Sequence, residues 1–180
     1  MNTIEGQCRH WVDTMVVGLN LCPFAKRSLD EDSVRFCIHE GKLAELADSF
    51  IAELQRLDVD PSIETTLLVI ANGLEDFDHY LDVLDGANAI LEELDYVGEY
   101  QIASFHPDYQ FENTHPNDVE NYTNRSPYPI LHILREASLE KAIAAFGEEN
   151  AEQVPENNIR TLQSLGLQHI KVLLSRSHNP

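Results

Sequence analysis

Hydrophobic positions at the start of the chain recur at helical spacing. The apolar stripe consists of Ile4, Cys8, Trp11, Val12 and Met15. Such a stripe predicts a helix over residues 4–18 that ends at Gly18. In SVRFCIHE, by contrast, apolar and polar residues alternate, and this pattern predicts a half-buried strand.

Two further helix–strand pairs are predicted in the middle of the chain. Residues 42–57 are amphipathic, and the continuous apolar run in ETTLLVIANG predicts a buried strand that ends at Asn72 and Gly73. Residues 75–94 predict another helix, and VGEYQIASF predicts a third strand, which ends at His106. Strands separated by helices of this length are typical of βαβ units with right-handed crossovers.

The remainder of the chain is predicted to be helical, after a long irregular segment. Pro129 fits the first position of a helix that runs to Gly147. Pro155 opens another helix, and Gly166 separates it from a last one. The sequence therefore predicts a single α/β domain over residues 1–180, with a small, mainly parallel sheet and with helices at both ends.

The formal net charge of −19 narrows the range of partners that the chain fits. Binding to nucleic acid or to an anionic membrane depends on Lys and Arg, so neither partner is expected. No apolar run approaches the roughly 20 residues that span a bilayer, and the start MNTIEGQCRHW shows no secretory signal. We therefore expect a cytoplasmic protein, and the sequence indicates no particular protein partner.

The cysteines and histidines bear on disulfides and metals. The three cysteines are Cys8, Cys22 and Cys37. Their number is odd, and no two of them have CxxC spacing. Neither a disulfide framework nor a structural zinc site is therefore expected. Side chains of suitable type for a metal also occur at His106, Asp108, His115 and His132. Their spacing matches no established motif, and no Gly-rich phosphate-binding fingerprint occurs, so we predict no metal and no cofactor.

The irregular segment FHPDYQFENTHPNDVENYTNRSPYP, residues 105–129, is the most unusual part of the chain. Loops longer than about 15 residues in compact domains are usually functional or disordered. The aromatic residues of this one, Tyr109 and Tyr122 among them, argue against disorder. In open α/β sheets, ligands bind beyond the carboxyl ends of strands, where Asn72 and His106 are predicted to lie. We expect the loop to pack over these ends and to line a pocket.

Arg125 is an isolated cation beside this loop, because no Lys or Arg occurs between Arg56 and Arg125. Its guanidinium, the hydroxyl of Ser126 and the amino end of the helix predicted at Pro129 would together bind a carboxylate or phosphate. Asn124 could add an amide group, although Asn residues of such loops more often hold local turns. Alternatively, Arg125 pairs with a loop carboxylate and only pins the loop.

Cys22 in NLCPF is a candidate nucleophile. If the following turn is helical, the thiol lies at a helix amino terminus, where its pKa falls, and Lys26 and Arg27 act in the same direction. His106 or His132 would then be the base of a Cys–His arrangement. Free cysteines are, however, commonly small core residues, and His132 fits a surface or packing role equally well.

Three long blocks, VVGLNLCPFAKR, FHPDYQF and NYTNRSPYPILHILRE, resemble the bacterial domain-of-unknown-function 1415 family. The resemblance extends over essentially the whole chain and includes its length. It implies a small cytoplasmic bacterial protein, and it implies no reaction, cofactor or catalytic residue.

Two hypotheses for the function follow from these patterns. In the first, the protein is an enzyme that acts on a small anionic molecule bound by Arg125 and Ser126. Cys22 or His106 then performs the chemistry. In the second, the protein is a non-catalytic ligand-binding or protein-interaction module, in which the loop and Arg125 form the recognition surface and Cys22 is structural. A nucleophilic Cys22 thiol of low pKa would favour the first hypothesis, and an inert one the second.

Overall fold

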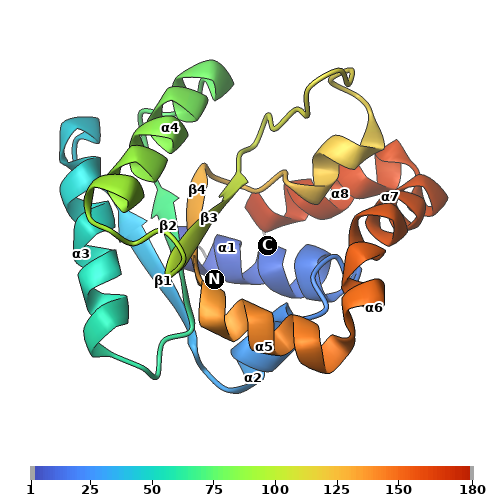
Figure 1. The fold of residues 1–180 in the computed structure, drawn as a ribbon. Coiled ribbons are helices and arrows are strands. Elements are labelled where there is room, and N and C mark those ends of the chain that lie inside the picture. The colour runs from blue at the N-terminus through green and yellow to red at the C-terminus, as the bar shows by residue number, and fades with distance from the viewer. Residues whose placement is uncertain (1–2, 179–180) are drawn as a thin grey trace.

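The computed structural model describes residues 3–178 and shows a four-stranded sheet between two layers of helices (Figure 1). The strands are β1 (Val34–His39), β2 (Thr65–Ile70), β3 (Tyr100–Phe105) and β4 (Ile130–Arg135). The longer helices are α1 (Ile4–Trp11), α3 (Leu46–Val59), α4 (Phe77–Glu93), α5 (Glu136–Phe146), α7 (Val154–Leu165) and α8 (Leu167–His178). Shorter ones are the π-helix η1 (Val12–Val17), α2 (Ala25–Asp30), the 3₁₀-helices η2 (Leu43–Glu45) and η3 (Val119–Thr123), and α6 (Glu148–Glu152). The sequence predicts one domain over residues 1–180, of which residues 1–2 and 179–180 lie outside the described part.

The order of the strands in the sheet is β1-β2-β4-β3. β1 and β2 are parallel neighbours joined through α3, as the βαβ pattern predicts. β4 lies between β2 and β3 and runs antiparallel to both. The α/β class is therefore confirmed, but the expected mainly parallel sheet is wrong, because two of the three strand pairs are antiparallel. β3 still runs in the same direction as β1 and β2, so these three strands end at the same edge of the sheet.

Residues 130–135 form β4, whereas the sequence predicts a helix from Pro129 to Gly147. The apolar run ILHIL is short, and such runs fit a buried strand and a helix equally well. In the fold, the strand form is stabilised by ladder hydrogen bonds along both of its edges, one to β2 and one to β3. The helix of this region, α5, begins only at Glu136 and is capped at Gly147. The prediction is therefore wrong for the start of the helix and correct for its end.

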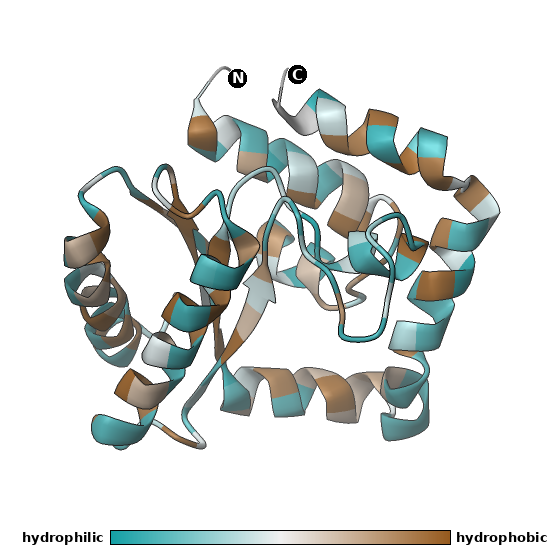
Figure 2. Ribbon diagram, turned by 90° about the horizontal axis from the view of Figure 1, so that it is seen from above, coloured by the Kyte–Doolittle hydropathy of each residue, from teal (hydrophilic) through white to brown (hydrophobic). Residues whose placement is uncertain are grey.

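Successive strand residues point to opposite faces of the sheet, and each face has its own core. On one face, Leu68 and Ile70 of β2 pack with Phe50 of α3, and α4 completes this layer. On the other face, Leu67 and Val69 of β2 pack under α1, η1, α7 and α8. Apolar residues accordingly concentrate in the strands and on the helix surfaces turned towards them (Figure 2).

The helix predicted over residues 4–18 is confirmed, with one change of form. Its first part is α1, and its second part is the π-helix η1, which has Gly18 as its C-cap residue. Single π-helical turns are rare and occur often at functional sites. Here the π-helical segment contributes Val12 and Val16 to the wall of a cavity against the sheet.

Candidate functional site

A cavity of about 220 Å³ lies between the sheet face that bears Leu67 and the helices α1, η1, α2 and α5. Its walls are mostly apolar and include Trp11, Val16, Leu67, Phe105, Leu134 and Leu139. The polar side chains that reach it are Cys22, Ser28, Thr65 and His132. A small polar group set within apolar walls is the usual composition of a site for a small molecule.

The side chains of Thr65 and His132 meet because β2 and β4 are neighbours in the sheet. In the antiparallel pairing His132 lies opposite Leu67, and Thr65 lies two residues away along β2 on the same face. Nε2 of His132 is 2.7 Å from Oγ1 of Thr65. The hydroxyl of Thr65 in turn donates a hydrogen bond of 2.7 Å to the carbonyl of Ile133. The pair is therefore fixed from two sides at the floor of the cavity.

His132 is uncharged in this position. Its ring is partly buried beside the cavity, and the loss of hydration of the imidazolium form lowers the pKa of His132 to about 4. The ring of Phe105, with its centroid 6.1 Å away, adds to the apolar surroundings. His132 thus presents a neutral imidazole at physiological pH, which can accept a proton or a hydrogen bond but carries no charge.

Cys22 lines the same cavity as His132, so the structure brings two of the three predicted catalytic side chains to one place. The expected fall in the thiol pKa is not observed. Burial raises the pKa of Cys22, and the opposing effect of the backbone N–H groups of Phe24 and Ala25 is smaller. The predicted help from neighbouring cations is also lost, because Lys26 pairs with Asp30, and Arg27 pairs with Glu31. Cys22 is therefore a protonated, half-buried thiol.

His106, the other predicted base, is a fully buried structural residue. Its Nδ1 accepts a hydrogen bond of 3.0 Å from the N–H of Asp108, and its Nε2 donates one of 2.9 Å to the carbonyl of Leu74. The ring packs against Phe77 and Tyr80, so it belongs to the α4 side of the sheet. Both ring nitrogens are used, and burial lowers the pKa of His106. The residue is not among those that line the cavity.

Arg125 holds the long loop together through hydrogen bonds to backbone carbonyls. Its Nε donates to the carbonyl of Tyr109 at 3.1 Å, and its Nη2 donates to the carbonyl of Pro116 at 2.9 Å. The guanidinium also lies 4.4 Å from the ring centroid of Tyr122. Arg125 therefore ties two parts of the loop together, but its acceptors are carbonyls and not the loop carboxylate that the alternative expects.

The surroundings of Arg125 also disfavour an anion. The helix expected to point its amino end at this residue begins instead at Glu136. Three carboxylates, Asp76, Asp78 and Asp108, share the shallow surface pocket with Arg125. These carboxylates carry the same sign of charge as a carboxylate or phosphate ligand and would repel it. The geometry on which the predicted anion site depends is therefore absent from the described residues.

The remaining predicted ligand-binding residues have structural roles or no clear partner. Ser126 is buried and donates to the carbonyl of Tyr128, and the Asn124 amide donates to the carbonyl of Ser104 at 3.1 Å. Tyr122 is buried in the core, and Tyr109 packs its ring against Phe77 and Phe111. Asn72 is exposed beyond the end of β2. The loop does pack down, as expected, but its predicted residues do not form one site.

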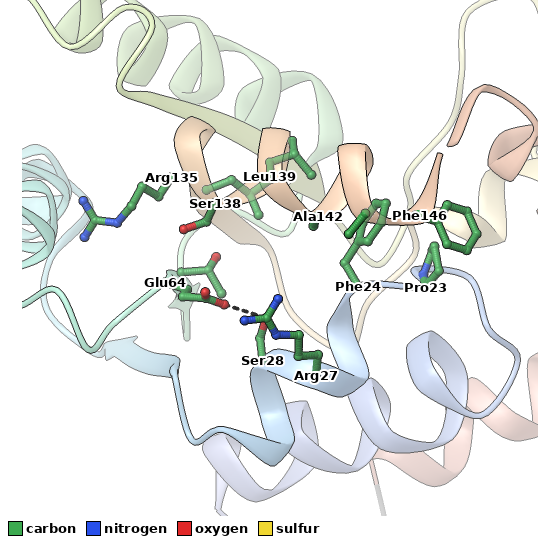
Figure 3. A pocket seen from close by; sticks show the side chains of 13 residues that line it. Pro23, Phe24, Arg27, Ser28, Glu64, Arg135, Ser138, Leu139, Ala142 and Phe146 are labelled. Carbon is green, nitrogen blue, oxygen red and sulfur yellow. Dashed lines mark hydrogen bonds between the residues drawn. The ribbon is translucent and has the colours of Figure 1, made fainter. Parts of the chain in front are cut away.

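A groove of about 290 Å³ lies between α2 and α5, beside the cavity (Figure 3). Residues shared by the walls of groove and cavity are Phe24, Ser28, Thr65, Leu134 and Leu139. The hydroxyl of Ser28 donates to the carboxylate of Glu64 at 3.0 Å, and this pair marks the polar side of the groove. The rings of Phe24 and Phe146 meet edge to face at the other end.

Sequence reasoning does not single out Thr65 or Ser28. A signal for Thr65 and His132 was nevertheless present, because each is a polar residue in a segment that is rich in apolar residues, ETTLLVI or ILHIL. Polar residues on a buried strand need a hydrogen-bond partner, and these two are partners of each other. The pairing could be seen only once residues 130–135 were known to be a strand beside β2.

A family model described as Protein of unknown function (DUF1415) matches residues 3–172 of the chain. No curated protein and no solved structure was found to match it. Within residues 3–178, no three or more His, Cys, Asp or Glu side chains are grouped so that they could hold a metal ion. None of the helices in the same part of the chain has both the length and the apolar character needed to cross a bilayer.

Proposed function

The chain belongs to the DUF1415 family, and we propose that the protein binds a small, largely apolar molecule in the cavity beneath α1, α2 and α5. The observation that carries this proposal is the cavity itself, which combines apolar walls with a few polar side chains, among them the Thr65–His132 pair. Ligand sites commonly have this composition, because the walls provide affinity and the few polar groups provide orientation.

The size of the cavity supports this proposal. Protein interiors are close-packed and contain few voids larger than a water molecule. A pocket of about 220 Å³ with apolar walls is therefore an unusual feature of a domain of this size. An engineered apolar cavity of about 150 Å³ binds benzene, so this one is large enough for a substituted benzene ring.

The charge of the ligand follows from the walls. Among the residues that line the cavity, all of them within the described chain, none is Lys or Arg. A buried anion without a paired cation is strongly disfavoured. The proposed ligand is therefore neutral, which differs from the small anion that the sequence predicts at Arg125.

An enzymatic role for Cys22 is the second candidate function. It is favoured by the position of Cys22 and His132 on the walls of one cavity. The thiolate–imidazolium pair that Cys–His catalysis uses is opposed here, because the pKa of the thiol is raised and that of the imidazole is lowered. Binding without covalent chemistry therefore ranks first, and neither candidate requires a metal or a cofactor.

The test of the binding proposal is an NMR titration with toluene as the probe. Trp11 is the single Trp of the chain and lines the cavity, so its indole N–H cross-peak reports occupancy. Toluene should shift this cross-peak in the wild type, and Ala103→Leu, which fills the cavity from β3, should abolish the shift. Ala52→Leu, the same change on the exposed side of α3, should leave it intact.

Two outcomes would overturn the proposal. One is a wild-type spectrum that toluene does not change. The other is an equal response in wild type and Ala103→Leu, since the probe would then bind somewhere other than the cavity. For the enzymatic candidate, Cys22→Ser removes the thiol, so any covalent chemistry should be lost in this variant.

A further inference from the structure

The hydrogens of the Thr65–His132 pair follow from the second contact of Thr65, which is with a carbonyl. The Thr65 hydroxyl has a single hydrogen, and a carbonyl cannot donate, so this hydrogen goes to the carbonyl of Ile133. Oγ1 of Thr65 must then accept the hydrogen bond from His132, so Nε2 of the ring carries the proton. In the neutral imidazole the other nitrogen, Nδ1, is consequently a bare acceptor.

This Nδ1 atom faces the cavity. No hydrogen bond other than the one from Nε2 to Thr65 reaches the His132 ring from the described residues. Thr66 Oγ1 is the one side-chain polar atom in that part of the chain that is both buried and without a partner. Nδ1 of His132, which lacks a partner as well, therefore keeps accessible surface, and the cavity is where the ring is exposed.

The other polar side chains of the cavity have no strong donor to offer. The indole N–H of Trp11 donates to the carbonyl of Arg125 at 3.0 Å. The hydroxyl of Ser28 donates to Glu64, and that of Thr65 donates to Ile133. The remaining donor is the thiol of Cys22, and an S–H group donates only weakly. The side chains that line the cavity thus present a free acceptor and no free N–H or O–H donor.

We propose that the ligand carries a hydroxyl group on an apolar body, as phenols and small alcohols do, and that this hydroxyl donates its hydrogen to Nδ1 of His132. The inference rests on the proposed function and names the ligand class of the same site. Ketones, ethers and hydrocarbons have no hydrogen to donate. Carboxylates bring a charge that no lining cation neutralises, and an ammonium group finds no carboxylate in the walls. His132 is then the residue that determines specificity.

The experiment compares toluene and phenol, which are similar in size and differ by a methyl and a hydroxyl group. Titrations followed by the Trp11 indole cross-peak give the dissociation constant of each probe in the wild type and in His132→Leu. The dissociation constant of toluene is divided by that of phenol for each protein. Comparing this ratio between the two proteins cancels the difference in hydration between the probes. We expect this ratio to fall roughly tenfold in His132→Leu, the loss that one buried hydrogen bond produces. Benzoate should bind less tightly than phenol.

A measurement on the wild type alone keeps the proposal testable if His132→Leu does not fold. Phenol should move the ¹⁵N resonance of His132 Nδ1, and toluene should leave it unchanged. If toluene binds but the ratio and the Nδ1 resonance do not respond, the hydroxyl class is wrong and the cavity function stands. If benzoate binds more tightly than phenol, the neutral class is wrong. If neither toluene nor phenol binds, the proposed function and this inference fail together.

Discussion

Nε2 of His132 donates a hydrogen bond of 2.7 Å to Oγ1 of Thr65, and this contact joins β4 to β2 on the face of the sheet that bears the cavity. Because the Thr65 hydrogen is used by the carbonyl of Ile133, the contact also decides which imidazole nitrogen stays free. A single side-chain pair thus links the fold of the sheet to the chemistry of the proposed site.

Thr65 and Thr66 are neighbours in β2, and the same substitution should have opposite effects on them. Thr66 Oγ1 is buried without a partner, so Thr66→Val should raise the free energy of unfolding by about 1 kcal/mol. Thr65→Val removes the acceptor of His132, so it should lower that free energy by about 1–2 kcal/mol. Urea denaturation with unchanged m-values measures both. Changes of the same sign in the two variants would contradict the hydrogen-bond assignment.

Stability should depend on pH through His132. Its pKa is about 4 in the folded protein and about 6.5 in the unfolded chain. Between these values the unfolded state binds more protons, so the free energy of unfolding falls as the pH is lowered from about 6.5 to about 4. The slope approaches about 1.4 kcal/mol for each pH unit. His106, whose pKa is also lowered, acts in the same direction.

The control for this pH dependence is His132→Gln, which keeps a polar side chain but does not titrate. Its stability should fall less steeply over the same range, because only the part due to His106 and the acidic groups remains. Denaturation curves at several pH values compare the two proteins. Parallel pH profiles for wild type and His132→Gln would show that His132 is not buried in a neutral form.

The three cysteines should react slowly with iodoacetamide near pH 7.5. Burial raises the pKa of Cys8 to about 12 and that of Cys37 to about 11, and it raises the pKa of Cys22 as well. Only the thiolate reacts, so each residue should be alkylated more slowly than a cysteine in an unfolded peptide. Toluene should slow Cys22 further and leave Cys37, which packs on the α3 side, unchanged. Fast labelling of Cys22 at neutral pH would instead support the enzymatic candidate.

Arg125→Ala should loosen the loop of residues 105–129 without affecting the cavity. The variant loses two hydrogen bonds to loop carbonyls and the contact with the ring of Tyr122, so amide exchange in the loop should become faster. Phosphate should not stabilise the wild type in a thermal denaturation series beyond the effect of a matched salt. A specific stabilisation by phosphate that Arg125→Ala removes would restore the anion site predicted from the sequence.

Sequence periodicity predicts the local elements well where a segment is long or its pattern is strong. The helix over residues 4–18 and the buried strand in ETTLLVIANG are both present, because an amphipathic stripe and a continuous β-branched run have few alternatives. The prediction for residues 130–135 is wrong because their apolar residues fit both the helical and the strand period. Only the open edges of β2 and β3, which are formed by distant parts of the chain, make the strand the better choice.

The site is harder to predict than the fold because its residues are far apart in the chain. Cys22 and His132 were both candidates, yet the partner that orients His132 is Thr65, and the walls also come from Trp11 and Phe105. No spacing in the sequence connects these positions. Arg125 misleads for a related reason, since an isolated cation looks like a ligand group until the carbonyls that it binds are known.

Diffraction from a crystal held under xenon pressure tests the central claim most directly. Xenon binds dry apolar cavities of this size, so it should give an electron-density peak between β2, β4 and η1, in contact with Leu67 and Val16 and beside His132. Ala103→Leu crystals should lack that peak. Wild-type crystals without xenon at this position would show that no open apolar cavity exists, and the proposed ligand site would have to be abandoned.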